Sequence, residues 1–212
     1  MGRAVIVYGK SGSGKSRSLK NFEEDEIFLI NVTSKDLPFR KKFKYTVKSD
    51  KLQTILAGLQ KMPTNVAVID DATFLMTNTF MREHATTRDN FGLYNSIADG
   101  MYRIFELVPS LPEDVIVYVI LHEDERDSGA IKLKTIGKLL DEKFPMEAQV
   151  TICLRCITDG DRHYFRTQST GYDISKSPEE MFPLEIENDL AAVDTAIREY
   201  YGIEPRKRAI TT

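Results

Sequence analysis

A phosphate-loop pattern, G-x-x-x-x-G-K-S, near the start of the chain constrains the fold more than any other feature. Its eight residues are Gly9, Lys10, Ser11, Gly12, Ser13, Gly14, Lys15 and Ser16. A short apolar run, residues 4–8, precedes the pattern, and a helix is expected to begin near Lys15. Because this strand–loop–helix order is the context that the motif needs, the sequence predicts an α/β protein that binds a nucleoside triphosphate.

The spacing within the loop has a physical reason. Glycines at positions 9, 12 and 14 let the backbone curl around a phosphate without Cβ clashes, so that several N–H groups converge on it. The start of the next helix adds unpaired N–H donors and the positive end of its dipole. We expect Lys15 to reach the β- and γ-phosphates, Ser16 to bind Mg²⁺, and Arg17 to lie at the nucleotide. The alternative is a glycine- and serine-rich turn with solvated lysines.

The composition favours one α/β domain. Of the 212 residues, 42% are hydrophobic and 29% are charged, which is ordinary for a globular domain with a substantial core. We expect a single ATPase domain over residues 1–201 and a basic, flexible tail over residues 202–212. The net charge of −3 gives no overall basic field that would attract nucleic acid, but it is compatible with a local basic surface.

The sequence also bears on the compartment. No run approaches the ~18 apolar residues of a membrane span, so no membrane partner is expected. The phosphate loop stands where a signal peptide would be, and a cytoplasmic location is expected. Cys153 and Cys156 form a C-x-x-C pair on a predicted strand, residues 149–157, where side chains three apart face opposite sides. We interpret them as two reduced cysteines rather than a metal or redox site, because a zinc site needs two further ligands.

Apolar runs and helical periodicity alternate along the first two thirds of the chain. Four continuous runs predict buried parallel strands: residues 4–8, 27–30, 66–69 and 115–121. Apolar side chains at helical spacing predict helices over residues 52–62, 94–108 and 136–144, each followed by a proline. The alternation predicts a P-loop NTPase with a RecA-like, mainly parallel twisted sheet flanked by helices.

The last third changes character. Residues 149–157 and 162–167 flank a Thr-Asp-Gly-Asp turn, which predicts a C-terminal β-hairpin. Residues 177–180 read Ser-Pro-Glu-Glu and predict the capped start of a helix. A final helix is expected to begin near Asn188.

Two acids end the strand predicted over residues 66–69. Parallel strands place their carboxyl ends at the ligand crevice, so Asp70 is expected to hold Mg²⁺. Asp71 is a candidate to orient or deprotonate the attacking water, and the alternative is a helix N-cap. The next strand runs into His122, a candidate γ-phosphate sensor or a structural hydrogen-bonding residue. Glu123 competes with Asp71 for the role of activating water.

Two basic segments are candidate contacts for a ligand. Lys132 and Lys134 lie in a predicted polar loop, residues 123–134, and either contact a triphosphate in a neighbouring subunit or are solvated. Basic residues 40–42 and 44 are interleaved with aromatic residues 39, 43 and 45, a pattern that suits single-stranded nucleic acid but suits an exposed strand better. His84 and His163 are predicted to be surface or packing residues.

Several segments together resemble a known family. They are residues 9–16, 30–32, 37–40, 68–71, 135–143 and 188–198. They look like the short P-loop ATPases encoded by bacteriophages, which have a RecA-like core without flanking domains and are in part linked to single-strand annealing and recombination. The resemblance implies hydrolysis of ATP with Mg²⁺, single-stranded DNA as a partner, and a homo-oligomer such as a filament or ring. It also implies that Lys132 and Lys134 reach ATP on a neighbouring subunit.

The chain departs from RecA itself at one point. RecA carries a catalytic glutamate after its second core strand, whereas residues 31–33 here read Asn-Val-Thr, without an acid. This leaves Asp71 and Glu123 as the acids that compete for the water. The leading hypothesis is an ATPase in DNA recombination. The alternatives are a nucleotide-dependent switch for a protein partner and a small-molecule kinase, the latter disfavoured because residues 123–134 contain one arginine and more acids than bases.

Overall fold

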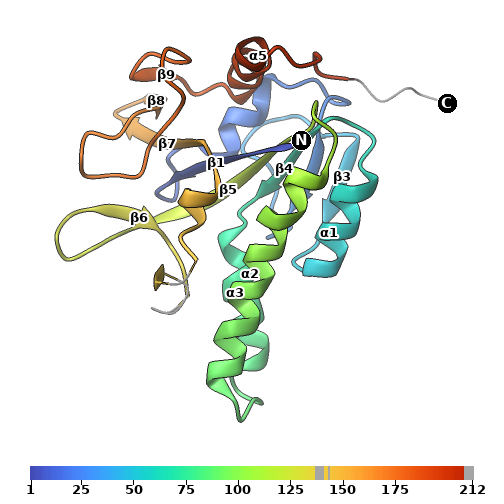
Figure 1. Cartoon of the computed structure of the whole chain (residues 1–212), viewed down its shortest axis with the longest axis vertical. Helices are drawn as coiled ribbons and strands as arrows, with labels where there is room; N and C mark the ends of the chain where they lie inside the picture. The colour runs from blue at the N-terminus through green and yellow to red at the C-terminus, as the bar shows by residue number, and fades with distance from the viewer. Residues whose placement is uncertain (137–140, 143, 208–212) are drawn as a thin grey trace.

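A predominantly parallel sheet organises the chain (Figure 1). The computed structural model describes residues 1–136, 141–142 and 144–207. The strands are β1 (Arg3–Gly9), β2 (Phe28–Asn31), β3 (Tyr45–Lys48), β4 (Val66–Asp70), β5 (Ile116–Glu125), β6 (Ile131–Leu133), β7 (Ile152–Asp159), β8 (Arg162–Arg166) and β9 (Glu185–Glu187). The helices are α1 (Leu52–Lys61), α2 (Thr73–Glu83), α3 (Asn90–Leu107), α5 (Leu190–Tyr201) and the 3₁₀ helices η1 (Ser16–Asn21), η2 (Val108–Ser110) and η3 (Met146–Gln149).

The nine strands follow the order β3-β2-β4-β5-β1-β7-β8-β9, and β6 pairs with β5. Every pair from β3 to β7 is parallel, whereas β8, β9 and β6 pair antiparallel. The prediction of an α/β fold with a mainly parallel sheet flanked by helices is therefore confirmed. The four apolar runs became β1, β2, β4 and β5.

The two faces of the sheet have separate cores. On one face, α1, α2 and α3 cover alternate strand residues such as Ile6 and Tyr8. On the other face, η1 and α5 cover the intervening ones, such as Val5 and Val7. Because both faces are buried, the central strands carry apolar residues without interruption.

Strand register brings the site residues to one edge. Gly9 lies opposite His122 across the β1–β5 pair, and Asn31 lies opposite Asp70 across the β2–β4 pair. Parallel strands end at the same edge of a sheet, so the phosphate loop and these polar residues meet there. The strand β5 separates β1 from β4, which gives His122 access to both neighbours.

Most predicted helices are confirmed. Helix α1 ends before Pro63, α3 ends one residue before the turn that contains Pro109, and α5 begins after Asp189, whose carboxylate accepts hydrogen bonds from two N–H groups. The helix predicted over residues 136–144 falls mostly on residues 137–140 and 143, which lie outside the described part of the chain. No helix within the described residues is long and apolar enough to cross a membrane.

The helix predicted from residues 177–180 is wrong. This segment forms a turn in which the Met181 N–H donates to the Pro178 carbonyl, and Glu180 has a positive φ of 63°. The Gln168 side chain donates to both the carbonyl and the hydroxyl of Ser177. The hydroxyl that would have capped a helix is therefore engaged with a neighbouring segment.

The polar loop predicted over residues 123–134 is also wrong. Strand β5 continues to Glu125 and β6 returns antiparallel to it, with Glu123 opposite Leu133. Ile131 and Leu133 are buried, while Lys132 and Lys134 alternate with them. The two-residue alternation that a half-buried strand requires was thus present in the sequence.

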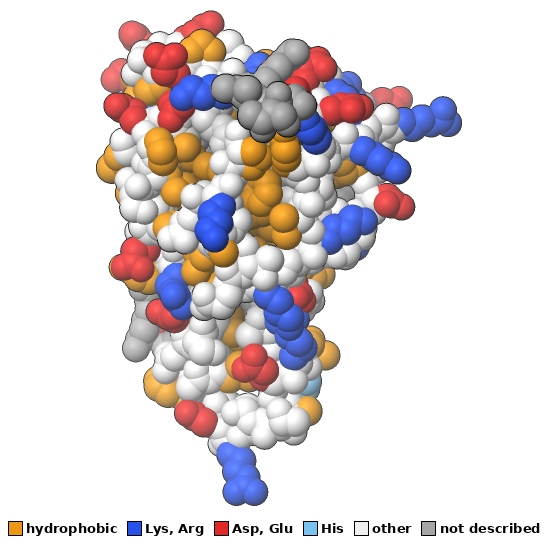
Figure 2. All heavy atoms as spheres, turned by 90° about the vertical axis from the view of Figure 1, so that its right-hand side faces the viewer, with side chains coloured by type: hydrophobic (Ala, Val, Ile, Leu, Met, Phe, Trp, Pro, Cys, Tyr) orange, Lys and Arg blue, Asp and Glu red, His pale blue; other side chains and the backbone are white. Residues whose placement is uncertain are grey.

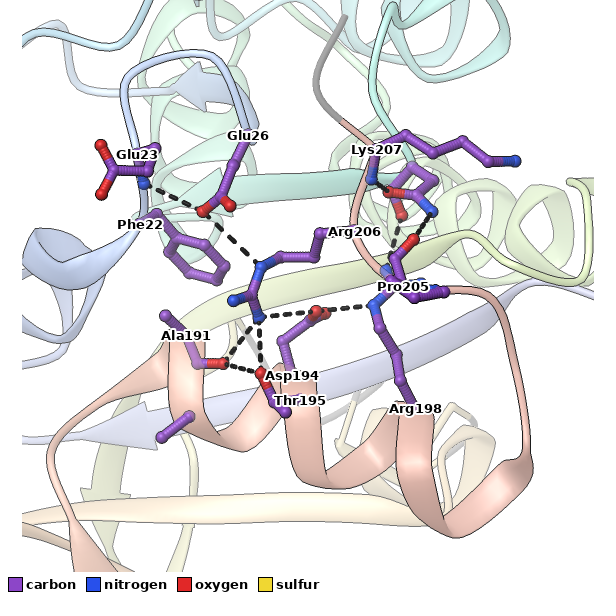
Figure 3. Close-up of polar contacts among 12 residues, drawn as sticks. Phe22, Glu23, Glu26, Ala191, Asp194, Thr195, Arg198, Pro205, Arg206 and Lys207 are labelled. Carbon is purple, nitrogen blue, oxygen red and sulfur yellow. Dashed lines mark hydrogen bonds and ion pairs between the residues drawn. The ribbon is translucent and has the colours of Figure 1, made fainter.

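The first part of the tail predicted over residues 202–212 is hydrogen-bonded to the domain (Figure 3). After Gly202, the Arg206 guanidinium donates to the Ala191 carbonyl at 2.8 Å and to Asp194 at 3.2 Å. The Lys207 N–H donates to the Asn65 side chain at 2.8 Å. Buried acceptors on α5 and beside β4 thus hold the basic residues against the domain. Residues 208–212 lie outside the described part.

Candidate functional site

The loop between β1 and η1 has two glycines in the left-handed region. Gly12 has φ 80° and Gly14 has φ 99°, values that L-residues rarely adopt. A Cβ atom on Gly14 would lie 2.8 Å from Nδ1 of His163, and one on Gly9 would lie 2.4 Å from the carbonyl oxygen of Cys156. Both backbone conformation and close neighbours therefore require glycine here.

The helix after the loop is shorter and tighter than expected. It is a 3₁₀ helix of six residues, Ser16–Asn21, with Lys15 at its N-cap. The prediction of a helix beginning near Lys15 holds in position, but so short an element contributes a smaller dipole than a full α-helix. Arg17 follows at the first turn and donates to the side-chain oxygen of Asn188 at 3.3 Å.

Lys15 is buried inside the loop. Its ammonium donates to the carbonyls of Gly9, at 2.9 Å, and Lys10, at 2.7 Å. Burial lowers the pKa of Lys15, while Cys156 and the nearby carboxylates act in the opposite direction. The positive charge is thus held at the centre of the loop, in a setting of reduced solvation.

Ser16 and Asp70 form the oxygen pair predicted for Mg²⁺. The Ser16 hydroxyl donates to Oδ1 of Asp70 at 2.9 Å. Burial, together with the neighbouring Asp71, raises the pKa of Asp70 to about 6. A hydroxyl and a carboxylate fit Mg²⁺, which binds oxygen ligands and usually takes one or two carboxylates plus substrate phosphates. The described residues contain no group of three His, Cys, Asp or Glu that would hold a metal alone.

Asp71 has a strained backbone and three partners. Its φ of 62° is uncommon for a residue other than glycine. Its carboxylate accepts from the Thr33 hydroxyl at 3.2 Å and lies 3.1 Å from Nε2 of His122 and 3.8 Å from the Lys35 ammonium. Burial opposes its ionisation, but the His122 hydrogen bond and the nearby positive charges prevail, so the pKa of Asp71 is lowered. Ala72 is the N-cap of α2, so the alternative that Asp71 caps this helix is wrong.

His122 connects the middle strand to Asp71. Its backbone N–H donates to the Thr73 hydroxyl at 2.8 Å, and its ring meets the Phe74 ring edge-on at 5.6 Å. The His122 side chain therefore lines the pocket and is hydrogen-bonded to Asp71 at the same time.

Glu123 is engaged elsewhere. Its carboxylate accepts two hydrogen bonds from the Arg155 guanidinium, at 2.8 and 3.0 Å, and its side chain is 3% exposed. Arg155, which the sequence did not single out, also lies 3.8 Å from the Asp173 carboxylate. Of the two acids that compete for the water, the structure places Asp71 in the pocket wall and Glu123 in this ion cluster.

Lys132 and Lys134 do not reach the phosphate loop of their own chain. The Lys132 ammonium is paired with the Asp141 carboxylate. Lys134 is exposed, and its backbone N–H donates to the His122 carbonyl at 2.8 Å. Lys132 on β6 and Lys134 just after it thus lie outside the pocket wall.

The loop residues line a pocket of about 380 Å³ at the carboxyl edge of the sheet. Its walls are residues 11–12 and 14–17 together with Lys35, Pro38, Asp71, His122 and His163. Sequence reasoning missed Lys35, Pro38 and His163 as members of this site.

His163 corrects the prediction of a surface or packing role. Its Nδ1 lies 2.8 Å from the Ser13 carbonyl and 3.2 Å from the Thr158 hydroxyl. The Cys156 thiol donates to the same carbonyl at 3.0 Å, and burial raises the pKa of Cys156 to about 11. The β7–β8 pair therefore supports the phosphate loop from the side. Cys153 and Cys156 are free and buried on opposite faces of β7, as predicted.

Residues 39–44 do not form the exposed strand that the sequence favoured. Strand β3 begins only at Tyr45, and the Phe43 side chain is buried. The Lys41 ammonium donates to the carbonyls of Lys20 and Phe22 at 2.7 and 2.6 Å. This segment forms one wall of a second groove, beside the phosphate-loop pocket.

Comparison of the sequence with protein-family models and with curated proteins finds no match. The chemistry of the site therefore has to be argued from its own residues. These residues are an ammonium within a glycine-rich loop, a serine–aspartate oxygen pair, and a strained aspartate held by a histidine, all around one pocket.

Proposed function

We propose that the chain is an ATP-binding and ATP-hydrolysing P-loop protein with a RecA-like core, similar to the phage ATPases of single-strand annealing and recombination. The observation that carries the proposal is convergence: Lys15, the Ser16–Asp70 pair and the Asp71–His122 pair come from three parallel strands and adjoin one pocket. ATP and Mg²⁺ are the ligands that this combination suits.

The loop supplies the phosphate contacts. The N–H groups of Gly12 and Gly14 donate to no protein acceptor among the described residues, which leaves them for phosphate oxygens. The Lys15 ammonium lies in the same loop, where it donates hydrogen bonds to two backbone carbonyls. Ser16 and Asp70 hold Mg²⁺, which neutralises charge on the phosphates when it is bound.

Asp71 orients the attacking water. Hydrogen bonds from Thr33 and His122 fix its carboxylate, and its lowered pKa keeps it ionised near neutral pH. An ionised carboxylate accepts a hydrogen bond from water without competing as a proton donor. His122 positions this carboxylate and, through its place in the pocket wall, responds to what the pocket contains. Glu123 does not orient the water, because Arg155 holds its carboxylate.

Assembly on single-stranded DNA is the second part of the proposal. Lys134 is exposed directly after β6 and suits a contact with ATP on a neighbouring subunit in a filament or ring. Lys132 has a partner, Asp141, which it must release for such a contact. Hydrolysis would then depend on assembly.

The test is ATP turnover without DNA, with single-stranded DNA and with duplex DNA. Lys15→Ala is expected to lower turnover by at least about 100-fold, the size typical of losing a charge-stabilising donor. Lys10→Ala is the matched control, because the Lys10 side chain is 69% exposed and lies 4.0 Å from Glu125. It is expected to keep turnover within about threefold.

Stimulation by single strands in the parent and in Lys10→Ala, but not in Lys15→Ala, is the expected result. Turnover that is unaffected by DNA over a range of protein concentrations would overturn the DNA part and shift the weight to a kinase or a switch. Equal turnover of Lys15→Ala and the parent would overturn the ATPase itself.

A further inference from the structure

A groove of about 1010 Å³ adjoins the phosphate-loop pocket on the side of β2 and β3. Lys35 belongs to the wall of both, so the two spaces are neighbours. The groove is larger than the phosphate-loop pocket and reaches the upper end of the range for small-molecule sites, about 300–1,000 Å³. It has room for more than one nucleotide unit.

Positive charge dominates this groove. Its walls carry five basic side chains against two acidic ones, in a chain whose net charge is −3. The basic ones are Lys35, Arg40, Lys41, Lys42 and Lys48. Figure 2 shows Lys and Arg side chains next to exposed apolar ones on the side of the molecule that includes β3 and α1. Clustered positive charge in a concave wall attracts a polyanion.

The basic side chains of the groove are not equivalent. Lys41 has a structural role, because its ammonium donates to two carbonyls of η1 and its C-cap. Arg40 and Lys42 are exposed on either side of it, and within the described residues neither side chain forms a hydrogen bond or an ion pair. These two side chains are therefore available to phosphate groups.

The groove also has an apolar part. Leu29, Leu37, Phe39 and Phe43 contribute to its walls. Phe43 is buried and holds the half-buried Phe39 edge-on at 6.3 Å. An aromatic ring beside exposed cations suits unpaired bases, which stack on aromatic faces while the backbone follows the positive charge. Duplex DNA keeps its bases stacked inside and offers no such contact.

Lys35 links the groove to the candidate catalytic acid. Its ammonium lies 3.8 Å from the Asp71 carboxylate and 5.1 Å from the centre of the Phe74 ring. Its carbonyl accepts a hydrogen bond from the Asn31 side chain at 2.6 Å, which fixes this segment to the end of β2. With 67% of the side chain exposed, the ammonium can exchange Asp71 for a phosphate in the groove.

We propose that this groove is the binding site for single-stranded DNA and that Lys35 couples its occupancy to Asp71. The inference rests on the proposed function, since it assigns the DNA site and the route of stimulation for hydrolysis in the adjoining pocket. A phosphodiester that draws Lys35 away from Asp71 leaves that carboxylate free to bind water.

The first test is fluorescence anisotropy with a labelled oligo(dT), using the full chain. Arg40→Glu/Lys42→Glu is compared with Lys61→Glu/Arg103→Glu, which reverses one exposed lysine and one exposed arginine on α1 and α3. Both variants change the net charge equally. The groove variant is expected to bind at least about tenfold more weakly, with a salt slope smaller by about 1.4 for two lost phosphate contacts, and the control within about twofold of the parent. Equal affinities of the two variants, or equal binding of a duplex of the same length, would overturn the groove as the DNA site.

The second test separates binding from coupling. Without DNA, Arg40→Glu/Lys42→Glu is expected to hydrolyse ATP at the parent rate, but its stimulation by single strands is lost. Lys35→Ala is expected to bind oligo(dT) within about threefold of the parent and yet lose stimulation; retained stimulation would overturn the coupling role. If Lys15→Ala abolishes turnover while Arg40→Glu/Lys42→Glu binds oligo(dT) as tightly as the parent, the groove is not the DNA site but the ATPase proposal stands. Groove-dependent DNA binding without any ATP turnover would instead support the groove as the DNA site and overturn the ATPase.

Discussion

Buried charges lie near both ends of the parallel strands. The group at the amino ends has more hydrogen-bond partners within the fold than the group at the carboxyl ends. In the tail anchor, which comprises Asp194, Arg198, Arg206 and their partners, Asp194 accepts hydrogen bonds from Tyr118 and Arg198. At the phosphate loop, burial raises the pKa of Asp70 to about 6 and lowers that of Lys15. The first group has compensated for its burial within the fold. The second retains a cost that a bound ion or phosphate can relieve.

The tail anchor is densely hydrogen-bonded, and Nε of Arg206 lies 3.6 Å from the Glu26 carboxylate in an ion pair (Figure 3). Arg198 donates from Nε to Asp194, from Nη1 to the carbonyls of Asp114 and Glu204, and from Nη2 to the Asn65 carbonyl. All of these contacts lie near the amino ends of β4 and β5. Dense hydrogen bonding there and shifted pKa values at the carboxyl edge divide the molecule into a stabilising side and a binding side, and substitutions on each side test this division.

The largest expected effect is on stability, from Arg198→Met. This change keeps an apolar stem but leaves the buried Asp194 without its closest cation and leaves the carbonyls of Asp114 and Glu204 without a donor. Removing one partner of a buried ion pair costs about 3–5 kcal/mol, so the free energy of unfolding in urea should fall by that amount. The matched control is Arg103→Met on the exposed face of α3. A difference below about 1 kcal/mol would show that the Arg198 hydrogen bonds are not what stabilises this side.

Asp71→Asn should have the next largest effect, and it should affect activity. We expect ATP turnover to fall about 100-fold, because the charge that orients water is lost, while asparagine tolerates the positive φ at this position. The free energy of unfolding should stay within about 1 kcal/mol of the parent. Glu123→Gln is the comparison. If steady-state turnover falls more in Glu123→Gln than in Asp71→Asn, then Glu123 and not Asp71 orients the attacking water.

Asp70→Asn should raise stability while abolishing Mg²⁺-dependent turnover. The pKa of Asp70 is raised from 3.8 to about 6, and each pKa unit corresponds to about 1.4 kcal/mol. Removing this buried charge should therefore add about 1–3 kcal/mol to the free energy of unfolding at pH 7.5 in Mg²⁺-free buffer. No gain in stability would mean that the carboxylate is compensated as fully as Asp194.

The same variant has a pH signature. In the folded parent Asp70 takes up a proton below about pH 6, whereas in the unfolded chain it does so only near pH 3.8. The folded state thus loses stability as the pH rises from about 4 to above 6. The advantage of Asp70→Asn, measured by urea denaturation across this range, should shrink towards zero near pH 4. A constant advantage would indicate a cause other than ionisation.

The smallest expected effect comes from the tail itself. Arg206→Ala removes a guanidinium that is 21% exposed and bonded to Asp194, and should cost about 1–2 kcal/mol. Lys207→Ala removes an ammonium that is 60% exposed and paired with Asp114, and should cost less than about 1 kcal/mol. Thermal unfolding of the two variants checks this order. A larger loss in Lys207→Ala would place the anchoring contact at Asp114.

The parts of the molecule that could be predicted are those whose cause is local. The glycine-rich turn within residues 9–16, β1 and the β4–Asp70 junction are each read from a few adjacent residues, because buried parallel strands are continuously apolar and glycine is required where φ is positive. The Ser16–Asp70 contact could also be predicted, because parallel strands end at one edge of the sheet.

The remaining parts depend on contacts between distant segments. His163 lies 150 positions from Ser13 in the sequence, and only the antiparallel return of β8 brings its ring to the loop. Lys35 enters the site through the course of the β2–β3 connection, which no periodicity specifies. Lys207 reaches Asp114, which lies 93 positions away in the sequence, and Arg206 reaches Asp194 only after the chain turns at Gly202, so adjacent residues specify neither contact of the tail.

The anchoring of the tail also fixes where the two ends of the described chain leave the domain. Arg3 pairs with Glu113, and Lys207 pairs with the adjacent Asp114, so both ends are held at the amino ends of the strands. The phosphate-loop pocket lies at the carboxyl ends. A fluorophore, affinity handle or surface tether attached at either end therefore projects away from this pocket, and single-molecule recordings of nucleotide exchange can be made on the immobilised protein without obstructing its entrance.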